Sequence, residues 1–143
     1  MNPSEWPGAF AEGWQRDKPG GFIDFFLPLI DEQAVFTQPL APTATGHAQI
    51  REMFELLFTR FPDFMVVPRE SRVEGDLVTI HSACTVTVGR RHLSFPAEDR
   101  LHLRAGRITR REARFSPRPL LGALILSPKV WPRLLTTPAR PRR

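Results

Sequence analysis

The sequence predicts an α+β fold, and three observations support this class. The first half contains segments whose apolar residues recur every three or four positions, as in amphipathic helices. Residues 64–115 instead alternate with the period of two that is typical of strands. Short turns at 74–76, 89–91 and 105–106 divide this second part. Helices followed by hairpin-linked strands indicate a curved, antiparallel sheet packed against helices.

The composition is that of a single soluble domain. The chain has 143 residues, of which 41% are hydrophobic and 24% charged, enough for one core. A single cysteine, Cys84, excludes an internal disulfide, and no His/Cys cluster suggests a metal site. No signal peptide is recognisable and no apolar run is long enough to span a bilayer. We therefore expect a cytoplasmic protein with no membrane partner.

The charge is divided unevenly along the chain. Residues 1–103 carry a net charge of −5, whereas residues 104–143 carry +10, giving +5 in total. A basic end can contact nucleic acid, but here the arginines alternate with Pro and Leu and no known nucleic-acid-binding pattern is present. Solvated surface is the favoured interpretation, and we expect no nucleic-acid partner.

Three helices are expected before the strands. One covers 5–16, with Ser4 as its N-cap, and a second covers 22–30. A short strand at 34–38 and a breaker-rich loop at 39–45 lead to a third helix over 46–61, which has the strongest amphipathic pattern. The apolar stripes of these helices are expected in the core.

The strand over 93–103 contains the residue that most needs an explanation. One of its faces carries an acid among five apolar side chains: Leu93, Phe95, Ala97, Asp99, Leu101 and Leu103. An ionised carboxylate among core residues is costly unless it has a partner. Asp99 must therefore be paired, be protonated, or line a cavity that something enters.

Two local motifs within this order of elements resemble a known family. The first is a strand and short loop leading to Gly46-His-Ala-Gln-Ile-Arg51, and the second is Asp99-Arg-Leu-His-Leu-Arg-Ala-Gly-Arg-Ile108. Together they are similar to the SnoaL-like branch of the nuclear transport factor 2-like superfamily, over about residues 5–117. The resemblance implies a cone-shaped α+β barrel, a curved sheet around helices with an apolar pocket. Relatives include polyketide cyclases, ketosteroid isomerases, epoxide hydrolases and non-catalytic subunits, so the fold leaves the function open.

The resemblance also suggests roles for single residues. Asp99 matches the aspartate that acts as general acid/base in SnoaL-like cyclases. Gln38 stands where ketosteroid isomerases have their catalytic base and cannot abstract a proton, and the chain has no tyrosine for their oxyanion site. Ala113 stands where limonene epoxide hydrolases have a second aspartate. Both of these specific mechanisms are therefore disfavoured.

Two hypotheses about Asp99 remain open. In the first, it moves a proton next to a carbonyl of an apolar substrate, without metal or cofactor, helped by His81 as a second acid/base. Gln38 would orient the carbonyl, and Arg111 would lie nearby. In the second, the protein is a non-catalytic ligand-binding or accessory module, Asp99 forms a structural salt bridge with Arg111 or Arg100, and His81 is an ordinary sheet residue. Under either hypothesis, Trp14, Phe54 and Phe115 are expected to line the pocket.

The domain organisation is expected to have three parts. Residues 1–117 form the cone, 118–136 a helical extension, and 137–143 a basic, disordered tail. The extension, with helices near 120–126 and 127–135, would cover the open end of the cone or pack on a second subunit. Because relatives often dimerise through the sheet, we expect a homodimer. His47 and His102 are expected at the surface.

Overall fold

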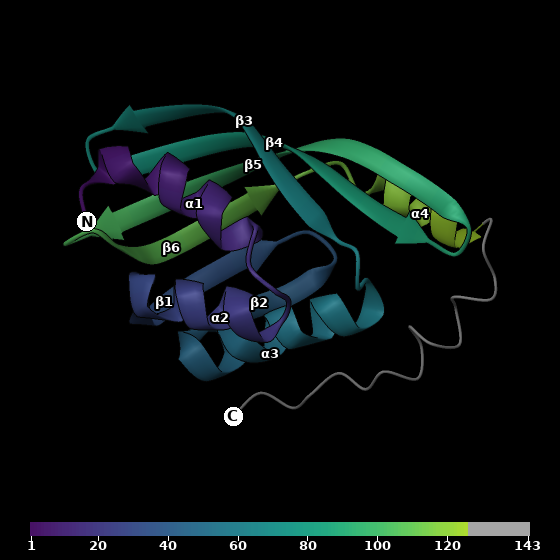
Figure 1. Ribbon diagram of the computed structural model, residues 1–143, viewed down its shortest axis with the longest axis horizontal. Helices are drawn as coiled ribbons and strands as arrows, with labels where there is room; N and C mark the ends of the chain where they lie inside the picture. The colour runs from purple at the N-terminus through teal and green to yellow at the C-terminus, as the bar shows by residue number, and fades with distance from the viewer. Residues whose placement is uncertain (126–143) are drawn as a thin grey trace.

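The computed structural model describes residues 1–125 and contains one curved, open sheet of six strands (Figure 1). The strand order is β2-β1-β6-β5-β4-β3, and only the β1–β6 pair is parallel. The strands are β1 Ile30–Gln38, β2 Ala41–Thr45, β3 Met65–Glu74, β4 Leu77–Val88, β5 Arg91–Arg104 and β6 Arg107–Arg114. The predicted α+β class and the meander of β3 to β6 are confirmed.

Three helices cover one face of the sheet, which we call the inner face. They are α1 Trp6–Trp14, preceded by a 3₁₀ turn at Pro3–Glu5, α2 Gly20–Phe26, and α3 Gly46–Arg60. Helix α1 lies against β3 and β4, whereas α3 lies against β1 and β2 (Figure 1). The opposite side of the sheet is the outer face, and the core lies between the inner face and the helices.

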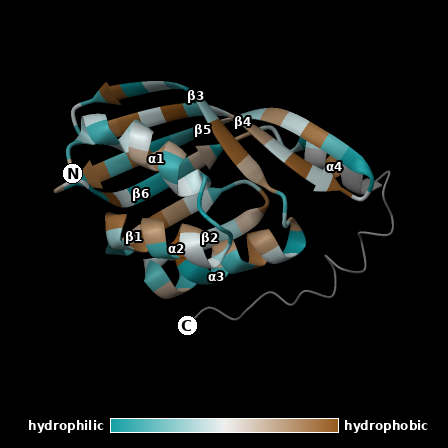
Figure 2. Cartoon of the chain, viewed as in Figure 1, coloured by the Kyte–Doolittle hydropathy of each residue, from teal (hydrophilic) through white to brown (hydrophobic). Residues whose placement is uncertain are grey.

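Alternation along the strands separates these two faces. On β4, all six residues of the apolar row are buried: Val78, Ile80, Ser82, Cys84, Val86 and Val88. The residues between them are half-buried or exposed. Figure 2 shows the same alternation of hydrophobic and hydrophilic positions along the strands. The prediction of a strand over 77–88 is confirmed with the same bounds.

The helices contribute an aromatic cluster to the core. The Phe22 ring centre lies 4.6 Å from that of Trp14, 4.9 Å from that of Phe54 and 5.2 Å from that of Phe58. All three of these pairs meet edge to face, the arrangement that aromatic quadrupoles favour. The apolar stripes predicted on the three helices are therefore core surfaces.

Two local expectations were wrong. The segment 39–45, expected as a loop, contains the edge strand β2, which follows a tight turn with Leu40 at φ 64°. An edge strand tolerates Pro42, because one side of it needs no ladder hydrogen bonds. The second helix ends at Phe26 and a 3₁₀ turn continues to Leu29, so β1 begins at Ile30 rather than at Ala34.

The last described element is helix α4, Arg118–Ile125, close to the helix expected at 120–126. It lies along the β4–β5 hairpin, at the end farthest from α1 (Figure 1). The expectations about the second helix and the basic tail fall on 126–143, outside the described residues. Within 1–125, no helix has the length and apolar character needed to cross a bilayer. In the same range, no group of His, Cys, Asp and Glu has the arrangement of a metal site.

Candidate functional site

Asp99 and Arg111 form a buried ion pair on the inner face. The Asp99 residue is only 3% exposed, and the Nε of Arg111 donates a hydrogen bond of 2.7 Å to its Oδ1. The side chain of Arg111 is 16% exposed and that of Asp99 4%. A carboxylate this deep in the core is stable as an ion only with such a partner, so the pair explains why an acid can occupy this row.

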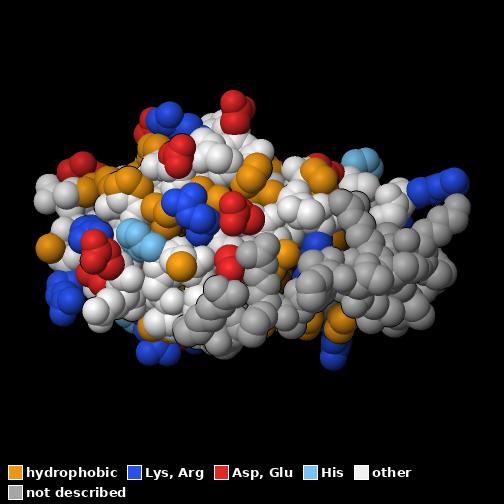
Figure 3. Space-filling model, turned by 90° about the horizontal axis from the view of Figure 1, so that it is seen from below, with side chains coloured by type: hydrophobic (Ala, Val, Ile, Leu, Met, Phe, Trp, Pro, Cys, Tyr) orange, Lys and Arg blue, Asp and Glu red, His pale blue; other side chains and the backbone are white. Residues whose placement is uncertain are grey.

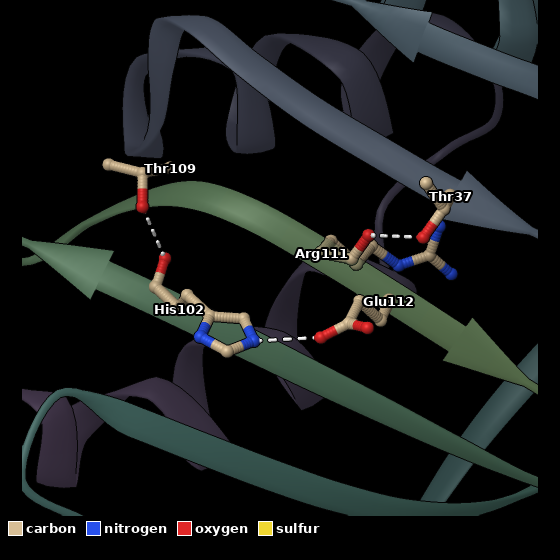
Figure 4. Close-up of polar contacts among 5 residues, drawn as sticks. All are labelled: Thr37, His102, Thr109, Arg111 and Glu112. Carbon is tan, nitrogen blue, oxygen red and sulfur yellow. Dashed lines mark hydrogen bonds and ion pairs between the residues drawn. The ribbon is translucent and has the colours of Figure 1, made fainter.

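A bulge in β6 turns Arg111 toward the inner face. His102 of β5 pairs with Arg110, but Leu103 pairs with Ile108, so Thr109 is an extra residue between them. The Thr109 hydroxyl donates to the His102 carbonyl at 3.1 Å (Figure 4). Without the bulge, alternation from the buried Ile108 would direct Arg110 inward. The extra residue shifts the alternation by one, and Arg111 faces Asp99 instead.

A small cavity lies next to this pair, between the sheet and the helices. Its volume is about 20 Å³, which is the space of roughly one water molecule. Trp14, Phe36 and Phe54 are among its lining residues, and Arg111 is the one charged residue in the lining. The guanidinium carbon of Arg111 lies 5.3 Å from the ring centre of Phe36, within reach of a cation–π interaction. The interior of the cone is thus nearly filled by aromatic side chains.

His81 lies on the outer face, away from Asp99. Its backbone pairs with Glu98, whereas Asp99 pairs with Ile80, and neighbouring residues of a strand point to opposite faces. The His81 side chain is 54% exposed, and its Nε2 lies 3.6 Å from Glu98 Oε1. It borders an open hollow of about 400 Å³ together with Arg69, Glu70 and Pro96. The structure therefore does not bring the two expected acid/base residues together.

Gln38 is oriented differently from the expectation. Its Nε2 donates to the carbonyl of Pro42 at 2.7 Å, within the β1–β2 turn. Because a carbonyl only accepts, this contact fixes which end of the amide is nitrogen. The Oε1 of Gln38 is buried without a hydrogen-bond partner among residues 1–125. The free atom of Gln38 is thus an acceptor, which would bind a hydroxyl rather than orient a carbonyl.

The remaining candidates have mainly structural surroundings. Trp14 and Phe54 line the cavity as expected, but Phe115 is half-buried and packs on Phe95, with ring centres 5.4 Å apart. His47 was expected at the surface, yet it is half-buried and its Nε2 lies 2.7 Å from the Ile30 carbonyl oxygen. His102 pairs with Glu112 at 2.8 Å on the outer face (Figure 4).

Two inner-face residues near Asp99 were not singled out from the sequence. Ser82 is 4% exposed, and its Oγ has no hydrogen-bond partner among the described residues. Burial raises the pKa of the Cys84 thiol to about 12, and the negative charge of Asp99 adds to the rise. Both residues belong to the apolar row of β4. From the sequence alone, a serine or cysteine in such a row is interpreted as a small core residue.

The site thus combines an aromatic interior with one ion pair. Such a site can bind an apolar molecule and contact one polar group of it through Arg111. Arg111 holds the Oδ1 of Asp99, and His81 cannot assist Asp99 from the outer face. Fold and site together define a small protein with an open cone of sheet around an aromatic interior.

Comparison with known proteins shows the family of this cone. Residues 8–111 match the model of the SnoaL-like domain. Because the match covers most of the chain, the protein belongs to the SnoaL-like domain family. A search of curated proteins finds no match to the chain.

Several solved structures share the fold at low sequence identity. TerC co-crystallised with polyporic acid is 22% identical with a TM-score of 0.74, and the match covers 87% of this chain and 99% of TerC. A putative SnoaL-like polyketide cyclase from Jannaschia sp. CCS1 is 19% identical with a TM-score of 0.70, covering 80% and 84%. An LEH-like epoxide hydrolase from M. tuberculosis is 15% identical with a TM-score of 0.65, covering 87% and 90%. At these identities the likeness shows the fold alone.

Proposed function

We propose that this protein binds an apolar small molecule between the inner face and the helices, with the Asp99–Arg111 pair as its polar anchor. The observation that carries the proposal is the 2.7 Å ion pair at the border of an aromatic-lined cavity. Aromatic walls with a few fixed polar groups are the usual composition of a small-molecule site. The co-crystal of TerC with polyporic acid, on the same fold, supports a small molecule as the ligand.

Ligand binding is favoured over catalysis because Asp99 is already bonded to Arg111 and has no second acid/base beside it among the described residues. Its Oδ1 is held by Arg111, and His81, the expected second acid/base, is on the outer face. The cavity holds about 20 Å³, so a ligand must displace aromatic side chains or enter beside Arg111. This arrangement supports a carboxyl group anchored by Arg111 rather than an unpaired acid that waits for a substrate.

Proton transfer by Asp99 is the second candidate function, and one observation favours it. Asp99 is the single buried carboxylate within residues 1–125, and it faces the interior where a ligand would lie. If a ligand drew Arg111 away, the freed carboxylate would become a base in an apolar environment, where charge interactions are strong.

2-Tetralone, a bicyclic ketone with exchangeable α-protons, tests both candidates. Under our proposal, NMR titration shifts signals of Trp14, Phe36 and Arg111, while deuterium enters the ketone no faster with the protein than in buffer. No binding, or shifts confined to outer-face residues such as His81, would contradict the proposal.

Accelerated deuterium uptake would instead favour the catalytic candidate, provided that Asp99→Asn abolishes it. Because removing one partner of a buried ion pair costs about 3–5 kcal/mol, Asp99→Asn alone is at risk of unfolding. The variant Asp99→Asn/Arg111→Gln removes both charges together and serves as the folded comparison. Arg110→Gln, at an exposed neighbour on β6, controls for the general effect of replacing an arginine on this strand.

A further inference from the structure

We propose that Arg111 recognises a carboxylate of the ligand, so that the molecules bound in the cone are apolar carboxylic acids. This inference rests on the proposed function, since it assigns a ligand class to the same site. The basis of the inference is that the Nε of Arg111 donates a hydrogen bond to Asp99 while its two Nη atoms donate none within residues 1–125.

Arg111 donates hydrogen bonds to the described residues through only one edge of its guanidinium group. Its Nε donates to Asp99, and neither of its Nη atoms donates to an acceptor within residues 1–125. The two Nη groups therefore form a planar fork whose donors are unused by the described chain. Such a fork matches the two oxygens of a carboxylate, which it binds through paired, charge-assisted hydrogen bonds.

Arg111 is the more accessible member of the ion pair. Arg111 is four times as exposed as Asp99, at 16% against 4% of the side chain, and Arg111 rather than Asp99 lines the cavity. An entering ligand therefore meets Arg111 before Asp99. The nearby Phe36 ring, 5.3 Å from the guanidinium carbon, excludes water from one face of the guanidinium and strengthens charge interactions there.

Asp99 holds this arginine in place before a ligand arrives. Its carboxylate offsets the charge of Arg111, so a buried cation needs no other partner when the site is empty. It also fixes the plane of the guanidinium through Nε, which leaves the Nη fork already oriented. A ligand carboxylate would then bind on the opposite edge, and the guanidinium would lie between two carboxylates.

A matched pair of probes tests the inference: 2-naphthoate and 2-naphthamide share the ring system and differ in the acid group. Isothermal titration calorimetry should show that the wild-type protein binds the naphthoate at least about tenfold more tightly than the amide. Arg111→Lys keeps the charge but loses the fork, and should reduce this preference severalfold. In Asp99→Asn/Arg111→Gln the preference should disappear, while affinity for the amide stays within about threefold of wild type.

Arg110→Gln is the matched control, because it removes a neighbouring arginine from the exposed outer face and should leave the preference unchanged. Equal affinity of the wild type for both probes would overturn the assignment to acids while leaving the proposed binding function intact. A preference that persists in the doubly neutral variant would overturn the role of Arg111. Binding of neither probe would contradict the proposed function and this inference together.

Discussion

At the scale of single residues, the site depends on the partner of one carboxyl group that is buried in the core. Asp99 lies between Ala97 and Leu101 on an otherwise apolar row, and Arg111 is its one described hydrogen-bond donor. Such a pair adds little net stability over an apolar replacement, but breaking it leaves an isolated buried charge. Stability alone therefore does not account for the pair, which agrees with the binding role that we propose for it.

Cys84, on the neighbouring strand, gives a prediction about this environment. Burial, with the charge of Asp99 adding to it, raises the thiol pKa from its ordinary 9.0 to about 12. At pH 8 the folded protein should therefore react with a thiol reagent such as DTNB at least about 100-fold more slowly than the urea-unfolded chain.

The same shift has a consequence for stability. The unfolded thiol ionises as the pH rises through 9.0 but the folded one only near 12, so the unfolded state is favoured increasingly between these values. Below pH 9 the thiol contributes no pH dependence. Urea unfolding should show that the free energy of unfolding is lower at pH 10 than at pH 7. This decrease should be smaller in Cys84→Ala than in the wild-type protein. In the DTNB experiment, equal rates of labelling for the folded and the unfolded protein would contradict the burial of the Cys84 thiol and its raised pKa.

At the scale of elements, α1 contains two glycines with opposite surroundings. A Cβ added at Gly8 meets nothing within 4 Å, whereas one added at Gly13 would lie 2.2 Å from Cζ of Phe26. The Phe26 ring packs against Phe10 and Phe22 and has little room to move. Gly13 is thus the position where α1 approaches α2 closely.

Alanine substitutions at these two positions should therefore have opposite effects. Gly8→Ala should raise the free energy of unfolding by about 0.5–1 kcal/mol, because alanine loses less conformational entropy in a helix. Gly13→Ala should lower it by about 1–3 kcal/mol, because the methyl group displaces the Phe26 ring. Urea denaturation of both variants measures the difference, and equal effects would show that the two helices do not pack in this way.

At the scale of the whole molecule, a hydrogen bond joins the N-terminal helix α1 to the β5–β6 turn. Trp6 is fully buried, and its Nε1 donates to the carbonyl of Gly106 at 2.8 Å, across 100 residues of sequence. It fixes the start of α1 to the β5–β6 turn, and so sets where the helices lie over the inner face. Figure 3 shows charged side chains of both signs mixed over the coloured part of the surface seen from below.

Trp6→Phe should lower the free energy of unfolding by about 1–3 kcal/mol beyond the loss of packing, because the Gly106 carbonyl loses its partner. Trp14→Phe is the matched control: Trp14 is 3% exposed, and its indole makes no hydrogen bond to a described residue. Thermal unfolding of both variants compares their losses in the free energy of unfolding. A similar loss in both would show that Trp6 acts through packing alone.

Much of the fold followed from patterns that are local in sequence. The helix stripes, the strand over 77–88 and the order of hairpins were predicted, because burial of one face imposes a period of 3.6 or 2 on apolar residues. The edge strand β2 was missed because its prolines and threonines have no apolar alternation, and its pairing with β1 provides the structure instead. The unusual position of Asp99 was also predictable, since an acid in an apolar row violates the local pattern, and the residue is buried as expected.

The sequence by itself thus determined the α+β class, the core faces and the position of the unusual carboxylate. Arg111 and Arg100 were both named from the sequence as partners of that carboxylate, and the tertiary structure decided for Arg111 and placed the other residues around it. The Thr109 bulge shifts the alternation of β6 by one residue and brings Arg111 to the inner face. The pairing of β4 with β5 places His81 on the outer face. The Gln38 amide donates its hydrogen bond within the β1–β2 turn. Bulges and registers arise from contacts between strands that are distant in sequence, so no local period encodes them.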